Sequence, residues 1–198
     1  MTGVMRRGLW WLMLAVVIAV VDQGTKYLAL SELPVRESVP VFPYLNFTLT
    51  SNPGGAFSFL SNQEGWQRWF FIVVSVVVSA VLIKWLLSLR VGHRTLALAL
   101  TLVLGGALGN LSDRIILGEV TDYIDVYYVK DFFGEDLGEQ TARGSFWKGY
   151  LYRGNVYHAG KYYENVFYRG WHWPAFNVAD SAIFIGALLL FVVIFRPD

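Results

Sequence analysis

Four long apolar segments constrain the fold of this chain more than any other feature. They cover residues 9–30, 69–87, 96–117 and 174–195. Segments of about 20 residues can cross a hydrocarbon core of roughly 30 Å as helices. With 55% hydrophobic and 16% charged residues, the chain is too apolar for an ordinary soluble domain. The sequence therefore predicts an all-α membrane protein with four transmembrane helices.

The basic residues predict how these helices are oriented. The short basic start resembles a signal peptide, but it lacks an A-x-A cleavage site and the helical pattern continues to Leu30, so we expect a retained first span. Cytoplasmic flanks of spans are rich in Lys and Arg. A four-span zigzag places six basic residues on one side, and both termini are therefore expected in the cytoplasm. These residues are Arg6, Arg7, Lys84, Arg90, Arg94 and Arg196.

Two polar segments differ from the spans. Residues 44–50 alternate like a half-buried strand and predict a small extracytoplasmic β element. Residues 127–173 combine charges, frequent glycines and many aromatic residues, a composition that argues against disorder. We expect an aromatic-rich β insertion at the membrane interface, forming an extracytoplasmic lobe at 127–173 within a single domain over 1–198. The lobe could serve as a lid, an interfacial anchor or a partner surface.

Composition excludes several classes of function. The chain has no Cys, which excludes disulfides, thiol nucleophiles and Cys-ligated metals. His93, His158 and His172 lack metal-ligand spacing, so neither a metal nor another cofactor is expected. A net charge of +1 provides no electrostatic footprint for nucleic acid, and no nucleic-acid partner is expected.

Carboxylates inside the apolar segments point to a site. At 1.5 Å per residue, Asp22, Asp113 and Asp180 all lie roughly 20 to 26 Å above the inner edge of the bilayer, in its outer third. A charge facing lipid costs at least about 2.5 kcal/mol, so these faces should point inward. Amide and basic residues share the same helix faces at i+3 or i+4 spacing. These neighbours are Lys26, Asn110, Arg114 and Asn177. We expect a polar pocket just below the outer surface.

Five short motifs carry a family resemblance. They are DQGTK at 22–26, NPGGAFS at 52–58, GGALGNLSDR at 105–114, VTDY at 120–123 and FNVAD at 176–180. In this order they resemble the motifs D-Q-x-T-K, N-x-G-x-A-F-S, G-G-A-x-G-N-x-x-D-R, V-x-D-F and F-N-x-A-D. That set is typical of the bacterial lipoprotein signal peptidases (type II signal peptidases), which are membrane aspartic proteases. The resemblance covers all but the second span and the 127–173 insertion.

The resemblance implies a catalytic pair formed by Asp122 and Asp180. Two carboxyls a few ångström apart cannot both ionise, so such a pair shares one proton and activates water without a metal or covalent intermediate. The implied substrates are prolipoproteins, cut before a cysteine that bears diacylglyceryl. The implied setting is the bacterial inner membrane, with membrane lipid around a monomer and the active site near the outer face. Residues assigned to pocket support or substrate binding are Asp22, Lys26, Asn52, Gly54, Asn110, Arg114 and Asn177.

Other interpretations of these residues stay open. Asp22 with Lys26 could be only a helix-end pair, Asp113 beside Arg114 is better explained as structural, and Asp125 competes with Asp122 for the catalytic role. The glycines of GGALG fit close helix packing, and those of NPGGAFS fit either a plain turn or a substrate contact. His158 and His172 are interpreted as residues of the lobe. The connection of 58 positions between Asp122 and Asp180 is much longer than is usual in the family.

Two other classes of function compete with a peptidase. Buried carboxylates with Lys and Arg also mark proton-coupled or ion-conducting proteins. A conduction pathway needs polar residues along its whole length, and the cytoplasmic halves of the predicted spans lack carboxylates. A membrane scaffold without catalytic activity leaves the convergent carboxylates unexplained.

Overall fold

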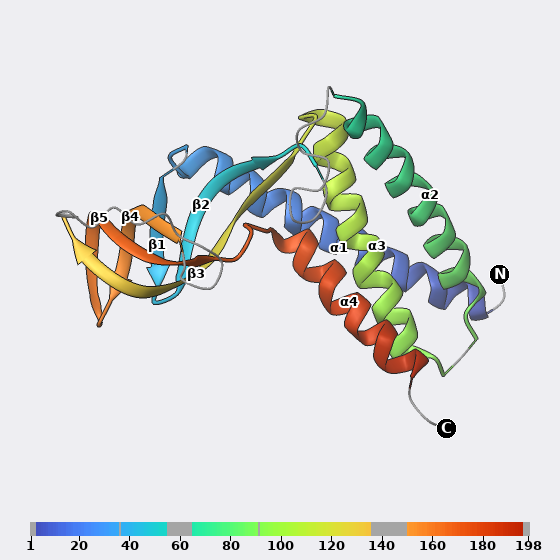
Figure 1. The fold of residues 1–198 in the computed structure, drawn as a ribbon. Helices are drawn as coiled ribbons and strands as arrows, with labels where there is room; N and C mark the ends of the chain where they lie inside the picture. The colour runs from blue at the N-terminus through green and yellow to red at the C-terminus, as the bar shows by residue number, and fades with distance from the viewer. Residues whose placement is uncertain (1–2, 36, 55–64, 91, 136–149, 196–198) are drawn as a thin grey trace. The chain divides into compact units, whose positions relative to one another are not determined.

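The computed structural model describes residues 3–35, 37–54, 65–90, 92–135 and 150–195 (Figure 1). The chain divides into two compact units. The first, called the helical unit, comprises Met1–Tyr27, Ser51–Val120 and Asn177–Asp198. The second, called the sheet unit, comprises Leu28–Thr50 and Thr121–Phe176. One helix, α1 (Gly3–Glu32), contributes residues to both.

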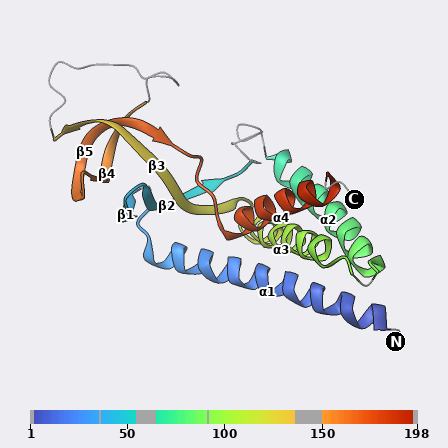
Figure 2. The same ribbon diagram turned by 90° about the horizontal axis from the view of Figure 1, so that it is seen from below.

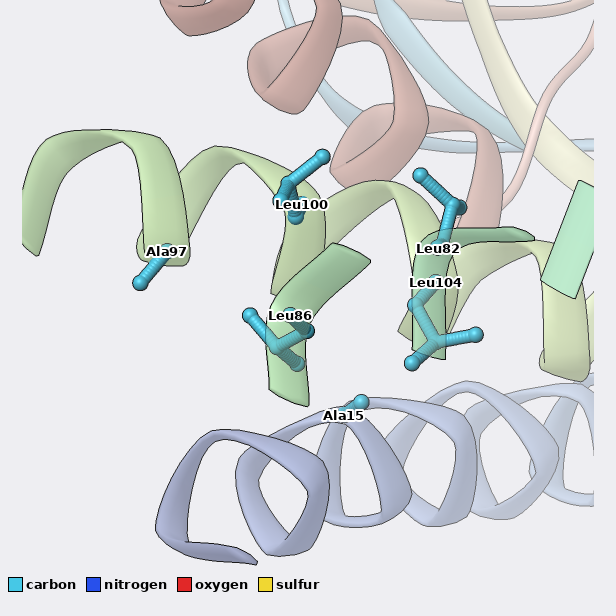
Figure 3. Close-up of a cluster of buried hydrophobic side chains, with 6 residues drawn as sticks. All are labelled: Ala15, Leu82, Leu86, Ala97, Leu100 and Leu104. Carbon is cyan, nitrogen blue, oxygen red and sulfur yellow. The ribbon is translucent and has the colours of Figure 1, made fainter. Parts of the chain in front are cut away.

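The helical unit is built from most of α1 together with α2 (Trp66–Ser88), α3 (Arg94–Ile116) and α4 (Val178–Ile194). In Figure 1, α3 lies between α2 and α4. A buried apolar cluster joins α1, α2 and α3 through short and medium side chains (Figure 3). Its members are Ala15, Leu82, Leu86, Ala97, Leu100 and Leu104.

Glycines allow α3 to approach its neighbours closely. A Cβ added at Gly105 would lie 2.7 Å from Cβ of Ile18, and one at Gly106 would collide with the backbone oxygen of Ala179. On α4, a Cβ at Gly186 would lie 2.8 Å from the backbone oxygen of Ala99. Small residues at contacts of this kind let helix backbones pack tightly in membranes, where no hydrophobic driving force operates between helices.

The outer surface of the helices is apolar. Trp10, Val20 and Phe184 are at least 64% exposed, while the polar Asp22, Lys26 and Asn177 are almost completely buried. This is the reverse of a soluble protein and fits a lipid environment. Among the residues that the structure describes, three helical segments are long and apolar enough to cross a membrane, namely Gly8–Glu32, Trp66–Ser88 and Arg94–Ile116.

The sheet unit is organised around a five-stranded sheet in the order β1-β2-β3-β5-β4 (Figure 2). Pairing is antiparallel between β1 and β2, between β3 and β5, and between β4 and β5. The strands are β1 (Ser38–Phe42), β2 (Leu45–Asn52), β3 (Val120–Gly134), β4 (Tyr150–His158) and β5 (Lys161–His172).

Turn chemistry and aromatic packing explain the long hairpin of β4 and β5. His158 pairs with Lys161, and the two residues between them, Ala159 and Gly160, both have positive φ (48° and 79°). Two-residue loops of this conformation match the right-handed twist of the strands they join. One face of β3, β4 and β5 then buries a cluster of five residues, which are Tyr127, Val129, Val156, Val166 and Tyr168.

The predicted fold class was wrong. The chain is not an all-α protein with four transmembrane helices, because its strands form one five-stranded sheet that includes residues before α2 and after α3. The fourth predicted span is also shorter as a helix than predicted. Asn177 caps it, so α4 covers only the 17 residues Val178–Ile194, a rise of about 26 Å against a hydrocarbon core of roughly 30 Å.

Candidate functional site

A buried lysine organises the polar interior of the helical unit. The Nζ of Lys26 lies 2.8 Å from Oδ2 of Asp22 and 2.9 Å from Oδ2 of Asp113, and it donates to Oδ1 of Asn110 at 2.9 Å. An ammonium has three donors, so these acceptors satisfy it completely. Lys26, Asp22 and Asp113 are each 2% exposed or less. The two carboxylates and the lysine they share therefore form a buried ion cluster that links α1 to α3.

Gln23 completes this cluster. Its Nε2 donates to Oδ1 of Asp113 at 2.6 Å and to the backbone oxygen of Gly109 at 3.1 Å. Gln23 was not among the residues predicted for the site, although it lies in the DQGTK motif. The sequence feature that could have indicated this role is the Gln next to Asp22, because an amide N–H can donate to a buried carboxylate.

The start of α4 contacts both α1 and α3. The backbone N–H of Ala179 donates to Oδ1 of Asp22 at 2.8 Å. Gly109 leaves the space for this arrangement, since a Cβ there would lie 2.5 Å from Oδ2 of Asp22 and 3.2 Å from Cβ of Ala179. The glycines of GGALG thus allow close helix packing, and the last of them, Gly109, leaves space for the Asp22 carboxylate.

Asn110 connects the ion cluster to Asp180. Its Nδ2 donates to Oδ1 of Asp180 at 2.7 Å, while its Oδ1 accepts from Lys26 and, at 3.2 Å, from Nδ2 of Asn177. Asn177 and Asp180 form a capping box at the start of α4. In it, the Asp180 N–H donates to Oδ1 of Asn177 at 2.8 Å, and the Asn177 N–H donates to Oδ2 of Asp180 at 3.3 Å. These bonds fix the rotamer of the Asp180 carboxyl.

Arg114 holds the NPGGAFS segment against α3. Its Nη2 donates to the backbone oxygen of Gly54 at 2.9 Å, and its guanidinium lies 4.9 Å from the ring centre of Phe71. Asn52 forms a local turn by accepting from the Gly54 N–H at 3.0 Å. Residues 55–58 of the motif lie outside the described residues, so a substrate contact there stays a prediction.

Arg68 is a second residue that binds the helix carrying Asn110 and Arg114 but was not among the residues predicted for the site. Its Nε donates to the backbone oxygen of Arg114 and its Nη2 to that of Ile115, both at 2.9 Å. These carbonyls belong to the last turn of α3, where intrahelical donors are absent. Gly118, just after the end of α3, has a φ of 92°, the left-handed conformation that commonly ends a helix. The sequence feature that could have indicated this role is a single Arg at the start of an apolar span.

Asp122 and Asp125 differ in their surroundings within the sheet unit. Both are almost fully buried on β3. Asp125 accepts from the Nδ1 of His172 at 2.8 Å and from the hydroxyl of Thr48 at 3.3 Å. Residues three apart on a strand point to opposite faces, so Asp122 and Asp125 do not share a face as they would on a helix. His172 is therefore a structural partner of Asp125.

The residues predicted for the site are distributed over both units. The helical unit brings together Asp22, Lys26, Asn110 and Asn177 around the Asp180 carboxyl, and Arg114, with Gly54, lies on the same helix α3 as Asn110. Asp122 belongs to the sheet unit. Among the described residues, no group of three or more His, Asp or Glu side chains has the geometry of a metal site.

Comparison with known proteins identifies the family. The family model for signal peptidase (SPase) II matches residues 14–196. A lipoprotein signal peptidase of Alteromonas mediterranea is 37% identical over 189 residues, covering 96% of this chain and 82% of the relative. One from Pseudomonas syringae pv. tomato is 41% identical over 187 residues, covering 94% and 86%.

A solved structure supports the fold. The chain is similar to a bacterial membrane enzyme with a TM-score of 0.65 at 24% identity, over 94% of this chain and 88% of that one. The likeness to this structure concerns the fold alone. Because the family model and the relatives cover nearly the whole chain, the chain belongs to the signal peptidase II family, a family of membrane proteases that process lipoproteins.

Proposed function

We propose that this chain removes the signal peptide from diacylglyceryl-modified prolipoproteins, cleaving before the lipidated cysteine with water activated by Asp122 and Asp180. The observation that carries the proposal is the environment of Asp180. Asp22 and Asp113 are buried and ion-paired to Lys26. Asp180 is only partly buried, and it forms no ion pair within 4 Å with a described Lys or Arg. Of Asp22, Asp113 and Asp180, it is therefore the carboxylate that is not held in an ion pair with Lys26.

Chain connectivity supports Asp122 as the second carboxylate. Within the sheet unit, the Phe176 N–H donates to the Ile124 oxygen at 3.0 Å, and the Ile124 N–H donates back at 2.9 Å. Asp122 precedes Ile124 by two residues, and Asp180 follows Phe176 by four. Since consecutive Cα atoms are about 3.8 Å apart, this pairing limits how far apart the two carboxylates can be. Asp125, by contrast, is already engaged with His172.

The proposed reaction is a general acid–base hydrolysis. The ionised carboxyl takes a proton from water, whose oxygen bonds to the scissile carbonyl carbon, while the neutral carboxyl protonates the carbonyl oxygen. Collapse of the resulting diol breaks the C–N bond, and the amine leaves with a proton from the pair. The Asn110 amide holds the Asp180 carboxyl in place, so little reorganisation is needed during the reaction.

Isosteric variants test the assignment. Purified protein in detergent is incubated with a diacylglyceryl-modified prolipoprotein and with its unlipidated counterpart. Wild type should cleave only the lipidated form. Asp122→Asn and Asp180→Asn should each lower the rate by at least about 10³-fold, as expected when one member of an acid–base pair is lost. Asp125→Asn is the matched control on β3, since it keeps an acceptor oxygen for Thr48.

Each outcome favours one assignment over another. Substantial activity in Asp122→Asn together with loss in Asp125→Asn would transfer the catalytic role to Asp125. Retained activity in Asp180→Asn would contradict the dyad altogether. Cleavage of neither substrate by wild type would contradict the proposed substrate class.

Orientation forms part of the proposal. The basic residues that flank the spans on one side support cytoplasmic termini and a site near the outer face. Because the chain has no native Cys, single cysteines introduced near Gly92 and at Lys161 can be labelled with an impermeant maleimide in whole cells. Labelling is expected only at Lys161→Cys. Labelling only near Gly92 would reverse the orientation.

A further inference from the structure

A cavity of about 280 Å³ lies in the helical unit, at the end where α1 begins, α2 ends and α3 begins. It is separate from the Asp22, Lys26 and Asp180 cluster, to which none of its lining residues belongs. Ten residues line it, namely Gly8, Trp10, Trp11, Leu86, Leu89, Arg90, Gly92, His93, Arg94 and Ala97.

The inner wall of the cavity is apolar. Leu86 and Ala97 are members of the buried core cluster shown in Figure 3, and Trp11 and Leu89 pack against that cluster. Trp10, in contrast, is 69% exposed. Tryptophan is favoured where the hydrocarbon of a bilayer meets its polar headgroups. The wall therefore combines a preformed apolar surface with an aromatic side chain suited to the membrane interface.

The rim of the cavity is cationic and has no carboxylate to neutralise it. Arg90 and Arg94 are exposed, and neither forms an ion pair with a described carboxylate. The sequence contains no Asp or Glu in residues 3–21, 65–112 or 181–197. The first turn of α3 has no acidic residue, and the side chain of its N-cap, His93, makes no capping hydrogen bond. The positive end of the α3 dipole adds to the charge of the two guanidiniums.

We propose that this cavity binds the phosphate-bearing headgroup of an anionic phospholipid. Basic pockets between transmembrane helices recognise such headgroups, and two arginines can hold phosphate oxygens with paired hydrogen bonds. The phosphate lies at the cationic rim, the glycerol backbone enters the apolar part of the cavity, and the acyl chains lie along the exposed apolar side chains of α1 and α2. A free phosphate would use only the rim, whereas a lipid uses both the cationic rim and the apolar wall.

Native mass spectrometry of the detergent-purified full chain tests the proposal. The protein is mixed with phosphatidylglycerol or with phosphatidylcholine at equal concentration, and the bound fraction of each lipid is measured. We expect phosphatidylglycerol to bind at least tenfold more tightly. The double variant Arg90→Gln/Arg94→Gln should lose this preference. Lys84→Gln is the matched control, because Lys84 is an exposed basic residue near the same end of α2 but does not line the cavity.

Two further arms distinguish a lipid site from a simple phosphate site and from a folding defect. Inorganic phosphate and glycerol phosphate in millimolar excess should not displace phosphatidylglycerol; if they do, the site is a phosphate site and not a lipid site. Cleavage of prolipoprotein in detergent by the double variant should match wild type and so show that it is folded. Equal binding of the two lipids by wild type, or an equal loss in Lys84→Gln and the double variant, would overturn the proposal.

Discussion

The Nδ2 of Asn110 donates a hydrogen bond of 2.7 Å to Oδ1 of Asp180. The same amide accepts through Oδ1 from Lys26 and Asn177. One side chain on α3 thus joins the ion cluster of Lys26, Asp22 and Asp113 to the capping box of α4. The carboxylate proposed to be catalytic is consequently positioned by a buried network whose other members are fully satisfied, which restricts its rotamer without neutralising it.

Substitution Asn110→Ala should impair both stability and cleavage. The change removes one hydrogen-bond partner from Lys26 and one from Asp180. A buried group left unsatisfied costs about 1–3 kcal/mol. Thermal unfolding in detergent and the cleavage rate provide the measurements, and both should fall. Ser112→Ala on the same helix removes only a hydroxyl bonded to the Leu108 carbonyl and should change neither much. Wild-type cleavage by Asn110→Ala would show that this amide does not position Asp180.

Substitution Lys26→Met should be among the most destabilising changes in the chain. It leaves the buried carboxylates of Asp22 and Asp113 without their shared cation, and breaking a buried ion pair from one side costs about 3–5 kcal/mol. We expect low accumulation in the membrane and a lower unfolding temperature. The triple variant Asp22→Asn/Lys26→Met/Asp113→Asn removes the uncompensated charges and should recover part of the loss. No recovery would argue against the ion cluster as the cause.

Glycine substitutions should distinguish close helix packing from helix propensity. A Cβ at Gly109 meets Oδ2 of Asp22 and one at Gly106 meets the Ala179 backbone, so alanine at either position should lower the unfolding temperature and the cleavage rate. Gly24 on α1 has no heavy atom within 4 Å of its added Cβ. There alanine should be neutral or stabilise by up to about 1 kcal/mol. Similar effects at all three glycines would contradict a specific role of Gly106 and Gly109 in close packing.

The raised pKa of the buried Tyr168 predicts that the sheet unit loses stability at alkaline pH. Burial, reinforced by the nearby Asp125 charge, raises the pKa of Tyr168 well above its ordinary value of 10.0. Above pH 10 the unfolded chain releases this proton while the folded chain retains it. The folded state then binds more protons, so the free energy of unfolding decreases as pH rises beyond 10. Unfolding followed by tyrosine absorbance and circular dichroism should show this decline.

Variant Tyr168→Phe should weaken that alkaline decline, although burial also raises the pKa of Tyr127 and Tyr152 and part of the slope will remain. At neutral pH the variant should be less stable, because Tyr168 shares a hydrogen bond of 2.8 Å with His172. Tyr150→Phe, at a residue that is 47% exposed, is the control and should leave the slope unchanged. An identical slope in Tyr168→Phe and wild type would refute the assignment.

Helices and family motifs could be read from local sequence. Apolar runs of about 20 residues specify membrane helices because the bilayer leaves few alternatives, and α1, α2 and α3 form where such runs occur. Short-range spacing also located the polar faces, since Asp22 with Lys26 and Asn177 with Asp180 are close on any helix. The motif order was sufficient to predict the family to which the chain belongs.

The strand arrangement and the identity of partners needed the tertiary structure. Strand pairing is a non-local property, so the sequence did not reveal that β2 and β3 are neighbours across α2 and α3. From the sequence, Asp125 competed with Asp122 for the catalytic role, whereas on strand β3 the two point to opposite faces and Asp125 pairs with His172. Local spacing determined which residues could share a helix face. Only packing decided that Lys26 pairs with both Asp22 and Asp113 while Asp180 accepts from the Asn110 amide, because hydrogen bonds between helices depend on how closely glycines such as Gly109 let those helices approach.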